Sequence, residues 1–301
     1  MRSREVHLVE RPQGLPTPAQ FRVVETDVPD PGDGQVLVEN IYMSVDPAMR
    51  PRLAGPTALN EAMIGGTIGR VIKSRHAGFK EGDHVESMHG FREHYLSDGK
   101  GLTTLDADGM PLIAYMSVLG LTGLTAYGGL LIIGALKDGE NVFVSAAAGA
   151  VGSAVVQIAK IIGMRVIASA GAPDKCALVR ELGADVVIDY KAEGSLADKL
   201  NAAAPDGIDV YFDNVGGAHL DAALGAAKDH ARFAMCGMIE TYNAPHPAAL
   251  ANIMRIVRAR IKMQGFIIFD YNHRIGEFHA QMGKWMMDGL IRSDEIGRAH
   301  V

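Results

Sequence analysis

Residues 144–160, VSAAAGAVGSAVVQIAK, combine small side chains with a spacing that could bind phosphate. Ala147, Gly149 and Gly152 match the pattern G-x-G-x-x-G with alanine at its first position. In that pattern Gly149 lets the backbone approach a pyrophosphate, and Gly152 lets the helix pack closely against the preceding strand. The free N–H groups of the helix N-terminus favour an anion. The spacing indicates dinucleotide binding, although a tight strand-to-helix turn also requires small residues.

The residues at the end of the next predicted strand indicate which dinucleotide is bound. An NAD enzyme presents a carboxylate there, about 20 residues after the glycines, to the adenosine ribose. The sequence VIASAGAPDK instead presents Ser169 and Gly171, and Lys175 follows at the start of a predicted helix. A nearby cation without a carboxylate favours the 2′-phosphate of NADP over NAD. The alternative is that Lys175 is an ordinary solvated lysine.

The cysteines and histidines do not have the spacing of a metal site. The two cysteines, Cys176 and Cys236, cannot supply the cysteine quartet of a structural zinc site. His84, His89 and His94 are spaced by five, which suits neither a helix face nor a strand face. We therefore expect no metal. Without a Lewis acid, a conjugated C=C bond is the easier hydride acceptor, because hydrogen-bond donors to its carbonyl are sufficient.

The elements that would position these residues change in character along the chain. The first third has short Val/Ile-rich strands separated by Gly, Pro and Asp, which is typical of a small barrel or sandwich. In SVDPAMR, Asp46 is a candidate N-cap with Pro47 at the first helical position. After about residue 115, strand and helix patterns alternate, and the strands are continuous apolar runs. This alternation predicts βαβ units and a parallel sheet covered on both faces.

Composition excludes several classes of protein. The chain has 301 residues, 48% of them hydrophobic, and a formal net charge of −6, so a sizeable core is expected and nucleic acid is not an expected partner. The charged N-terminal sequence has no apolar segment of a signal peptide, and LLIIGAL (130–136) is too short to span a bilayer. With only two cysteines, we expect a cytoplasmic protein without membrane association.

Several motifs resemble the zinc-independent medium-chain dehydrogenases/reductases, in the branch that contains prostaglandin/leukotriene, curcumin and alkenal double-bond reductases. They span nearly the whole chain in the family's order. The motifs are SVDPAMR (44–50), GLTAYGGL (123–130), VSAAAGAVGS (144–153), GADVVIDYK (183–191), YFDNVGG (211–217), CGMIETYN (236–243) and QGFII (264–268).

The resemblance implies an α/β fold in which a GroES-like β-barrel domain accompanies a doubly wound Rossmann domain. The barrel domain would comprise residues 1–115 together with 288–301, and the Rossmann domain residues 116–287. The implied cofactor is NADPH. The residues implied to bind it are Gly149, Ala150, Val151 and Gly152 at the pyrophosphate, Lys175 and Tyr190 at the 2′-phosphate, Asn214, Cys236, Gly237 and Met238 at the ribose and nicotinamide, and Phe266, Ile267 and Ile268 beside the nicotinamide.

Tyr242 matches the tyrosine that the family places near the substrate carbonyl, so it is the candidate catalytic residue. A partly exposed loop tyrosine is the alternative, and Asn214 before two glycines is also a natural turn. The sequence departs from the family's pattern at Ala48, where an aromatic residue is usual, and at 121–123. Its last residues, SDEIGRAHV, do not resemble the longer C-terminal segment of the family. We expect truncation or a foreign tail there.

The predicted activity is NADPH-dependent reduction of the C=C bond of α,β-unsaturated ketones and aldehydes. Two alternatives remain: an NADPH quinone oxidoreductase, and a low-turnover NADPH-binding sensor or scaffold. We also expect a homodimer, because the apolar stretch KMQGFIIFDY (262–271) comes last in the βαβ series and would form a sheet edge that needs a partner.

Overall fold

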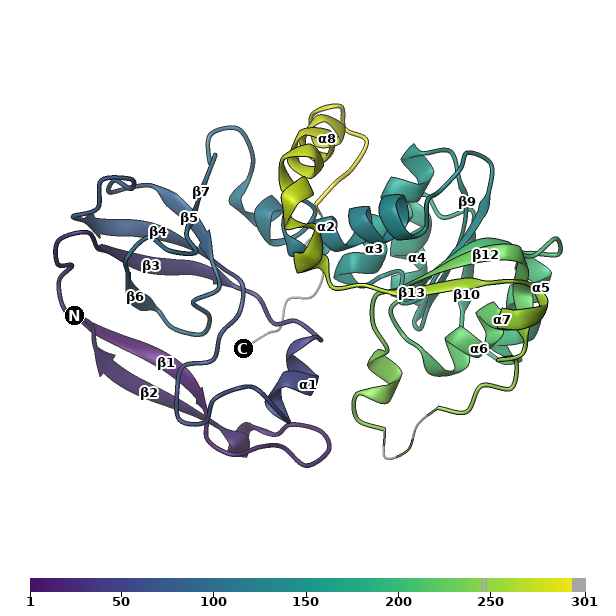
Figure 1. Cartoon of the computed structure of the whole chain (residues 1–301), viewed down its shortest axis with the longest axis horizontal. Coiled ribbons are helices and arrows are strands. Elements are labelled where there is room, and N and C mark those ends of the chain that lie inside the picture. The colour runs from purple at the N-terminus through teal and green to yellow at the C-terminus, as the bar shows by residue number, and fades with distance from the viewer. Residues whose placement is uncertain (245, 247, 294–301) are drawn as a thin grey trace. The chain divides into compact units, whose positions relative to one another are not determined.

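The structure is a computed structural model that describes residues 1–244, 246 and 248–293. The chain divides into two compact units, Met1–Met116 and Ser117–Val301. Figure 1 labels most of the helices and strands of both.

The first unit is built from antiparallel strands, as the sequence predicts for the first third. β1 (Arg2–Leu8) and β2 (Phe21–Asp27) form a hairpin. The second sheet has the order β6-β3-β4-β5-β7, and valines and Tyr95 on these strands form its core. The bounds are β3 (Val36–Met43), β4 (Thr67–Ser74), β5 (His84–Ser87), β6 (His94–Ser97) and β7 (Thr103–Leu105), with the short helices η1 (Pro18–Gln20), α1 (Met49–Leu53) and η2 (Leu112–Met116).

Helix α1 begins later than the sequence predicts. Its N-cap is Ala48, not Asp46, because Asp46 and Pro47 belong to a turn that precedes the helix. The Asp46 carboxylate accepts a hydrogen bond from the Ser44 hydroxyl at 2.7 Å, and its carbonyl accepts one from Met49 N at 2.9 Å.

The second unit contains a parallel sheet of the predicted doubly wound type. The strand order is β10-β9-β8-β11-β12-β13, and every neighbouring pair is parallel. Numbered along the chain this is 3-2-1-4-5-6, the order of a Rossmann domain. The strands are β8 (Asn141–Val144), β9 (Arg165–Ala170), β10 (Val186–Asp189), β11 (Ile208–Asp213), β12 (Ala227–Met235) and β13 (Lys262–Gly265).

Helices connect these strands and cover the sheet. They are α2 (Leu121–Tyr127), which runs into the π-helical segment η3 (Gly128–Ile133), then α3 (Ala150–Ile161), α4 (Pro173–Glu181), α5 (Leu196–Ala203), α6 (Gly217–Ala226), η4 (Ile239–Thr241), α7 (Arg255–Arg258), η5 (Ile268–Arg274) and α8 (Ile275–Met287). Among the described residues, no helix is both long and apolar enough to cross a membrane.

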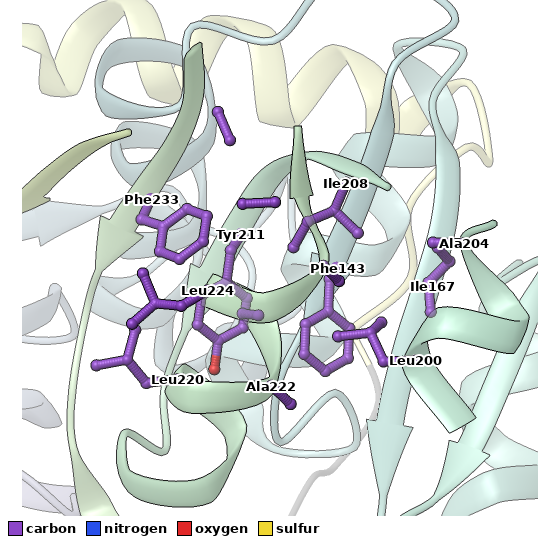
Figure 2. Packing of buried hydrophobic residues seen from close by; sticks show 14 of the residues in the cluster. Phe143, Ile167, Leu200, Ala204, Ile208, Tyr211, Leu220, Ala222, Leu224 and Phe233 are labelled. Atoms are coloured by element: carbon purple, nitrogen blue, oxygen red, sulfur yellow. The ribbon is translucent and has the colours of Figure 1, made fainter. Parts of the chain in front are cut away.

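Three aromatic rings on neighbouring strands form the centre of one sheet face. Tyr211 on β11 pairs in register with Phe143 on β8 and Phe233 on β12. The rings of Phe143 and Tyr211 stack with centroids 5.1 Å apart, and Phe233 meets Tyr211 edge-on at 5.2 Å. Leucines of α5 and α6 cover them, as Figure 2 shows for Leu200 and Leu220. This packing fixes the strand ends that carry the candidate site.

Three segments near the C-terminus differ from expectation. The strand–helix alternation predicted after residue 115 implies a helix after β12, but residues 249–261 form only the four-residue helix α7. The predicted edge strand 262–271 is paired only over β13, and the chain then turns into η5. Residues 288–293, assigned above to the barrel domain, fall in the second unit, where Arg292 N donates to Gln157 Oε1 at 2.9 Å. The assignment of residues 294–301 lies outside the described residues.

Candidate nucleotide-binding site

The predicted site residues of the second unit gather at one edge of its sheet. Because all the strands are parallel, their carboxyl ends meet at the same edge, at Val144, Ala170, Asp213 and Met235 among others. The chain leaves β8 toward β9 on one side, and β11 lies on the other side of β8. Ligands of doubly wound sheets bind at such a reversal of strand order.

The turn between β8 and α3 is too tight for larger side chains. Gly149 is the N-cap of α3, and its N–H donates to Ala146 O at 2.9 Å. A Cβ at Gly152 would lie 2.3 Å from Ala146 O and 2.8 Å from Ala147 Cα, both backbone atoms. Ala146 itself has φ +48°, a left-handed conformation that is costly for alanine. The small residues of the turn thus keep the helix N-terminus close to the strand end.

A groove of about 580 Å³ opens at this turn. Three of the predicted cofactor residues line it: Gly149, Lys175 and Tyr190. The Tyr190 ring lies over Gly171, where a Cβ would come within 2.5 Å of the ring. Gly171 therefore has to be glycine for Tyr190 to hold this position. The remaining lining residues are Ala146, Ala148, Ala170, Gly171, Leu196, Val215, Ala218, His219, Ile239 and Glu240.

The end of β9 presents no carboxylate to this groove. Ser169 is fully buried, and its hydroxyl has no hydrogen-bond partner among the described residues. The acidic group that lines the groove, Glu240, comes from η4 instead. Its carboxylate accepts a hydrogen bond from Ala218 N at 3.3 Å, at the N-terminus of α6. The charge pattern therefore places a lysine from α4 and a carboxylate from η4 around the same groove.

A buried hydrogen-bond network joins the ends of β8 and β11. Asp213 is fully buried, and its Oδ1 accepts from the hydroxyls of Tyr211 and Ser145 and from the N–H groups of Val215 and Gly216. Burial raises the pKa of the Asp213 carboxyl, and these hydrogen bonds oppose the rise. Asn214 donates its side-chain N–H to Ser145 O at 2.8 Å. The predicted ribose-side residue Asn214 is thus held rigidly at the strand ends.

The segment after β12 packs on this network. The N–H groups of Cys236 and Gly237 both donate to Asp213 O, at 2.9 and 3.0 Å. Burial raises the pKa of the Cys236 thiol to about 12, so it stays protonated at neutral pH. Met238 covers Gly216. The hydroxyl of Tyr242 lies 3.2 Å from the position of a Cβ on Gly237, so the tyrosine folds back over this segment.

The three residues after β13 divide between two environments. A Cβ at Gly129 would lie 2.7 Å from the Phe266 ring, and one at Gly128 would lie 3.0 Å from Ile268. Phe266 and Ile268 therefore pack inward on η3. Ile267 is 64% exposed.

The structure thus forms two groups of predicted residues. Gly149, Lys175 and Tyr190 share the groove, and Asn214, Cys236, Gly237, Met238 and Tyr242 follow the ends of β11 and β12. His219, Glu240 and Asp213 lie at the same sheet edge and were not predicted from the sequence. Two of these follow the strand ends in FDNVGGAHL and CGMIETYN, and a search for polar residues after every predicted strand would have found them.

The described part of the chain contains no cluster of side chains of the kind that binds a metal ion. No group of three or more His, Cys, Asp or Glu side chains among these residues could hold a metal ion. Cys176 and Cys236 are both free thiols.

Two family models match the chain. One describes the N-terminal domain of an oxidoreductase and covers residues 4–105; the other describes a zinc-binding dehydrogenase and covers residues 150–285. The Rossmann order, the glycine turn and the groove define the class as a dinucleotide-dependent oxidoreductase.

Individual relatives narrow this class. The NADPH-dependent curcumin reductase of Escherichia coli is 41% identical over 98% of this chain and 89% of its own length. Mouse prostaglandin reductase 1 is 38% identical over 94% of this chain and 87% of its own. CurA of Vibrio vulnificus, solved in complex with NADPH, has a TM-score of 0.90 at 40% identity, covering 97% of this chain and 90% of that one. The chain belongs to the zinc-independent medium-chain dehydrogenase/reductase family of these enzymes.

Proposed function

We propose that the chain is an NADPH-dependent reductase of the C=C bond in α,β-unsaturated ketones and aldehydes. The observation that carries the proposal is the groove at the sheet edge, where Lys175 and Tyr190 stand near the end of β9 and no carboxylate does. The curcumin and prostaglandin reductases among its relatives support the same reaction class.

The residues of the groove fit the adenosine half of NADPH. Its volume of about 580 Å³ lies within the range of small-molecule and cofactor sites. The N–H groups at the start of α3 would bind the pyrophosphate, since the N-cap Gly149 lines the groove without a side chain and Gly152 lets the helix start close to the strand end. Lys175 and Tyr190 would bind the 2′-phosphate.

The other half of the site would follow the ends of β11 and β12. Asn214 and residues 236–238 would contact the ribose and nicotinamide, with Phe266 and Ile268 beside them. Because its thiol stays protonated, Cys236 would pack against the cofactor without acting as a nucleophile.

When bound, NADPH supplies the hydride for the reaction. As the β-carbon of the substrate accepts it, negative charge develops on the carbonyl oxygen, and a hydrogen-bond donor there lowers the barrier. A phenol can donate without ionising. The Tyr242 hydroxyl has no hydrogen bond to another residue in the part of the chain that the structure describes, so it is available for this oxygen.

The activity is tested by mixing the purified chain with NADPH and, separately, an enone, an enal and a quinone. Loss of NADPH absorbance with the enone and enal, giving saturated carbonyl products, is the expected result. Turnover with the quinone alone would instead favour a quinone reductase. Tight NADPH binding without turnover of any substrate would favour a sensor or scaffold.

We further propose a homodimer that forms through β13. β13 is the edge strand of the parallel sheet, paired only with β12 in the described residues. Beside it, Ile267 is 64% exposed and Phe269 49% exposed. Pairing across a two-fold axis would satisfy the free backbone groups and bury these side chains. Light scattering at micromolar concentration should give twice the mass of the chain; the mass of one chain would contradict the dimer.

The roles of the two units and the cellular compartment of the protein are further parts of the proposal. We propose that the first unit is the substrate-binding domain and the second unit the cofactor-binding domain. The two free thiols suit a reducing compartment, and we propose the cytoplasm.

A further inference from the structure

His219 is a buried polar residue that borders the groove and that the proposed chemistry does not use. It lies in the first turn of α6, is 5% exposed, and belongs to the groove lining. Its Nε2 has no hydrogen-bond partner among the described residues. Its ring meets that of Tyr190 edge-on, with centroids 5.0 Å apart and planes at 78°.

An unpartnered imidazole nitrogen at this place is costly for the protein alone. A buried polar atom without a partner destabilises the folded protein, and an apolar side chain would fill the same position without that penalty. Burial lowers the pKa of His219 to about 4, so the ring is neutral at physiological pH. A neutral imidazole carries one N–H donor and one acceptor nitrogen. A ligand in the groove can supply the missing partner.

The other side chains around the groove indicate which ligand group would form a hydrogen bond with His219 Nε2. Tyr190, in ring contact with His219, and Lys175 from α4 line the same groove and offer a phenol donor and a cation. Both are suited to an anion, as is an imidazole that donates from Nε2. The carboxylate in the groove lining, Glu240, is engaged at Ala218 N.

We propose that His219 is a further specificity residue, which binds the 2′-phosphate of NADPH together with Lys175 and Tyr190. This inference rests on the proposed NADPH site. Through its edge-on contact, His219 also positions the Tyr190 ring over Gly171. Discrimination against NADH then depends on three side chains that come from α4, from the end of β10 and from α6.

The proposal predicts that NADPH binding is linked to proton uptake. A phosphate beside His219 stabilises the imidazolium, so the pKa of His219 in the NADP⁺ complex should exceed its value in the free protein. Between the two pKa values, lowering the pH strengthens binding relative to a variant without the imidazole. The titratable and charged groups on the surrounding elements are Lys175, Tyr190, Asp213, Glu240, Lys199 of α5 and Arg255 of α7. None of these groups contributes to the lowered pKa of His219 in the free protein, because burial alone causes it.

Equilibrium binding to His219→Leu tests the contact directly. Leucine fills a similar volume without a donor, and NADPH fluorescence gives Kd at neutral pH. We expect Kd for NADPH to rise roughly tenfold and Kd for NADH to change less than about twofold. His219→Gln, which keeps an N–H donor, should recover most of the NADPH affinity. His273→Leu removes an exposed imidazole on η5, outside the groove lining, and should change neither Kd.

Other results of the NADPH and NADH binding measurements would contradict the proposal. An equal loss of NADPH and NADH affinity would overturn the phosphate contact and point to the adenine or to packing. Unchanged affinity for both would overturn any cofactor role of His219. If the unsubstituted chain itself failed to prefer NADPH, the proposed function would fail first.

A spectroscopic measurement provides a second readout that does not depend on activity or affinity. The histidine Cε1–H resonance absent from His219→Gln is that of His219, and its chemical shift can be followed with pH. Saturating NADP⁺ should raise its pKa, and saturating NAD⁺ should not. The same pKa in both complexes would contradict the proposal.

Discussion

Gly152→Ala tests whether the tight turn at β8 and α3 is required for the cofactor site. The added Cβ would lie 2.3 Å from Ala146 O and 2.8 Å from Ala147 Cα, so the backbone of the turn has to move. Overpacking of this kind costs about 1–3 kcal/mol, whereas replacing glycine inside a helix gains about 0.5–1 kcal/mol. We expect a net loss of about 1–2 kcal/mol.

For a unit of this size, that loss lowers Tm by about 2–8 °C. The matched control is Gly276→Ala in α8, where nothing lies within 4 Å of the added Cβ. There only the helix-propensity gain applies, so Tm should stay constant or rise slightly. Thermal unfolding and NADPH titration of both variants are the assays, and Kd for NADPH should rise at least tenfold in Gly152→Ala alone. If Gly152→Ala instead raised Tm and kept its NADPH affinity, the argument from the close contact would be wrong.

Three further predictions concern the reaction. The chain should prefer NADPH over NADH at least tenfold in kcat/KM, about 1.4 kcal/mol. Lys175→Ala should lower that ratio because a charge-assisted phosphate contact is lost. Equal kcat/KM values for NADPH and NADH in the unsubstituted chain would exclude NADPH as the specific cofactor. Tyr242→Phe should lower kcat on an enone roughly 10–100-fold with little change in NADPH Kd, and full kcat would make Tyr242 only a pocket wall. Chelators should leave activity unchanged, and stoichiometric zinc with activity loss on chelation would contradict the expectation of no metal.

The parallel sheet could be predicted because each of its strands has the same sequence pattern, which is visible within a few consecutive residues. Strands buried on both faces read as continuous apolar runs, and segments such as 208–213 and 165–170 are bounded by turn residues. The turn of Gly149 and Gly152 was recognisable for the same reason, because each glycine is required by a close contact with Ala146 or Ala147, only a few residues away in the sequence.

The length of β13 could not be predicted, because a distant segment determines it. Phe266 and Ile268 have the pattern of an edge strand, but Gly128 and Gly129 on η3 leave space that their side chains fill. The chain therefore leaves the sheet after Gly265. Similarly, nothing in the sequence around His219 shows that Tyr190, 29 residues earlier, would lie against its ring.

Transfer of deuteride from 4-deuterated NADPH to a conjugated enone tests the central claim most directly. The account predicts a saturated ketone that carries one deuterium at the β-carbon, with the hydrogen at the α-carbon coming from solvent. Deuterium at the carbonyl carbon, in an allylic alcohol, would contradict it, because the charge would then have developed on an oxygen bonded to the reacting carbon.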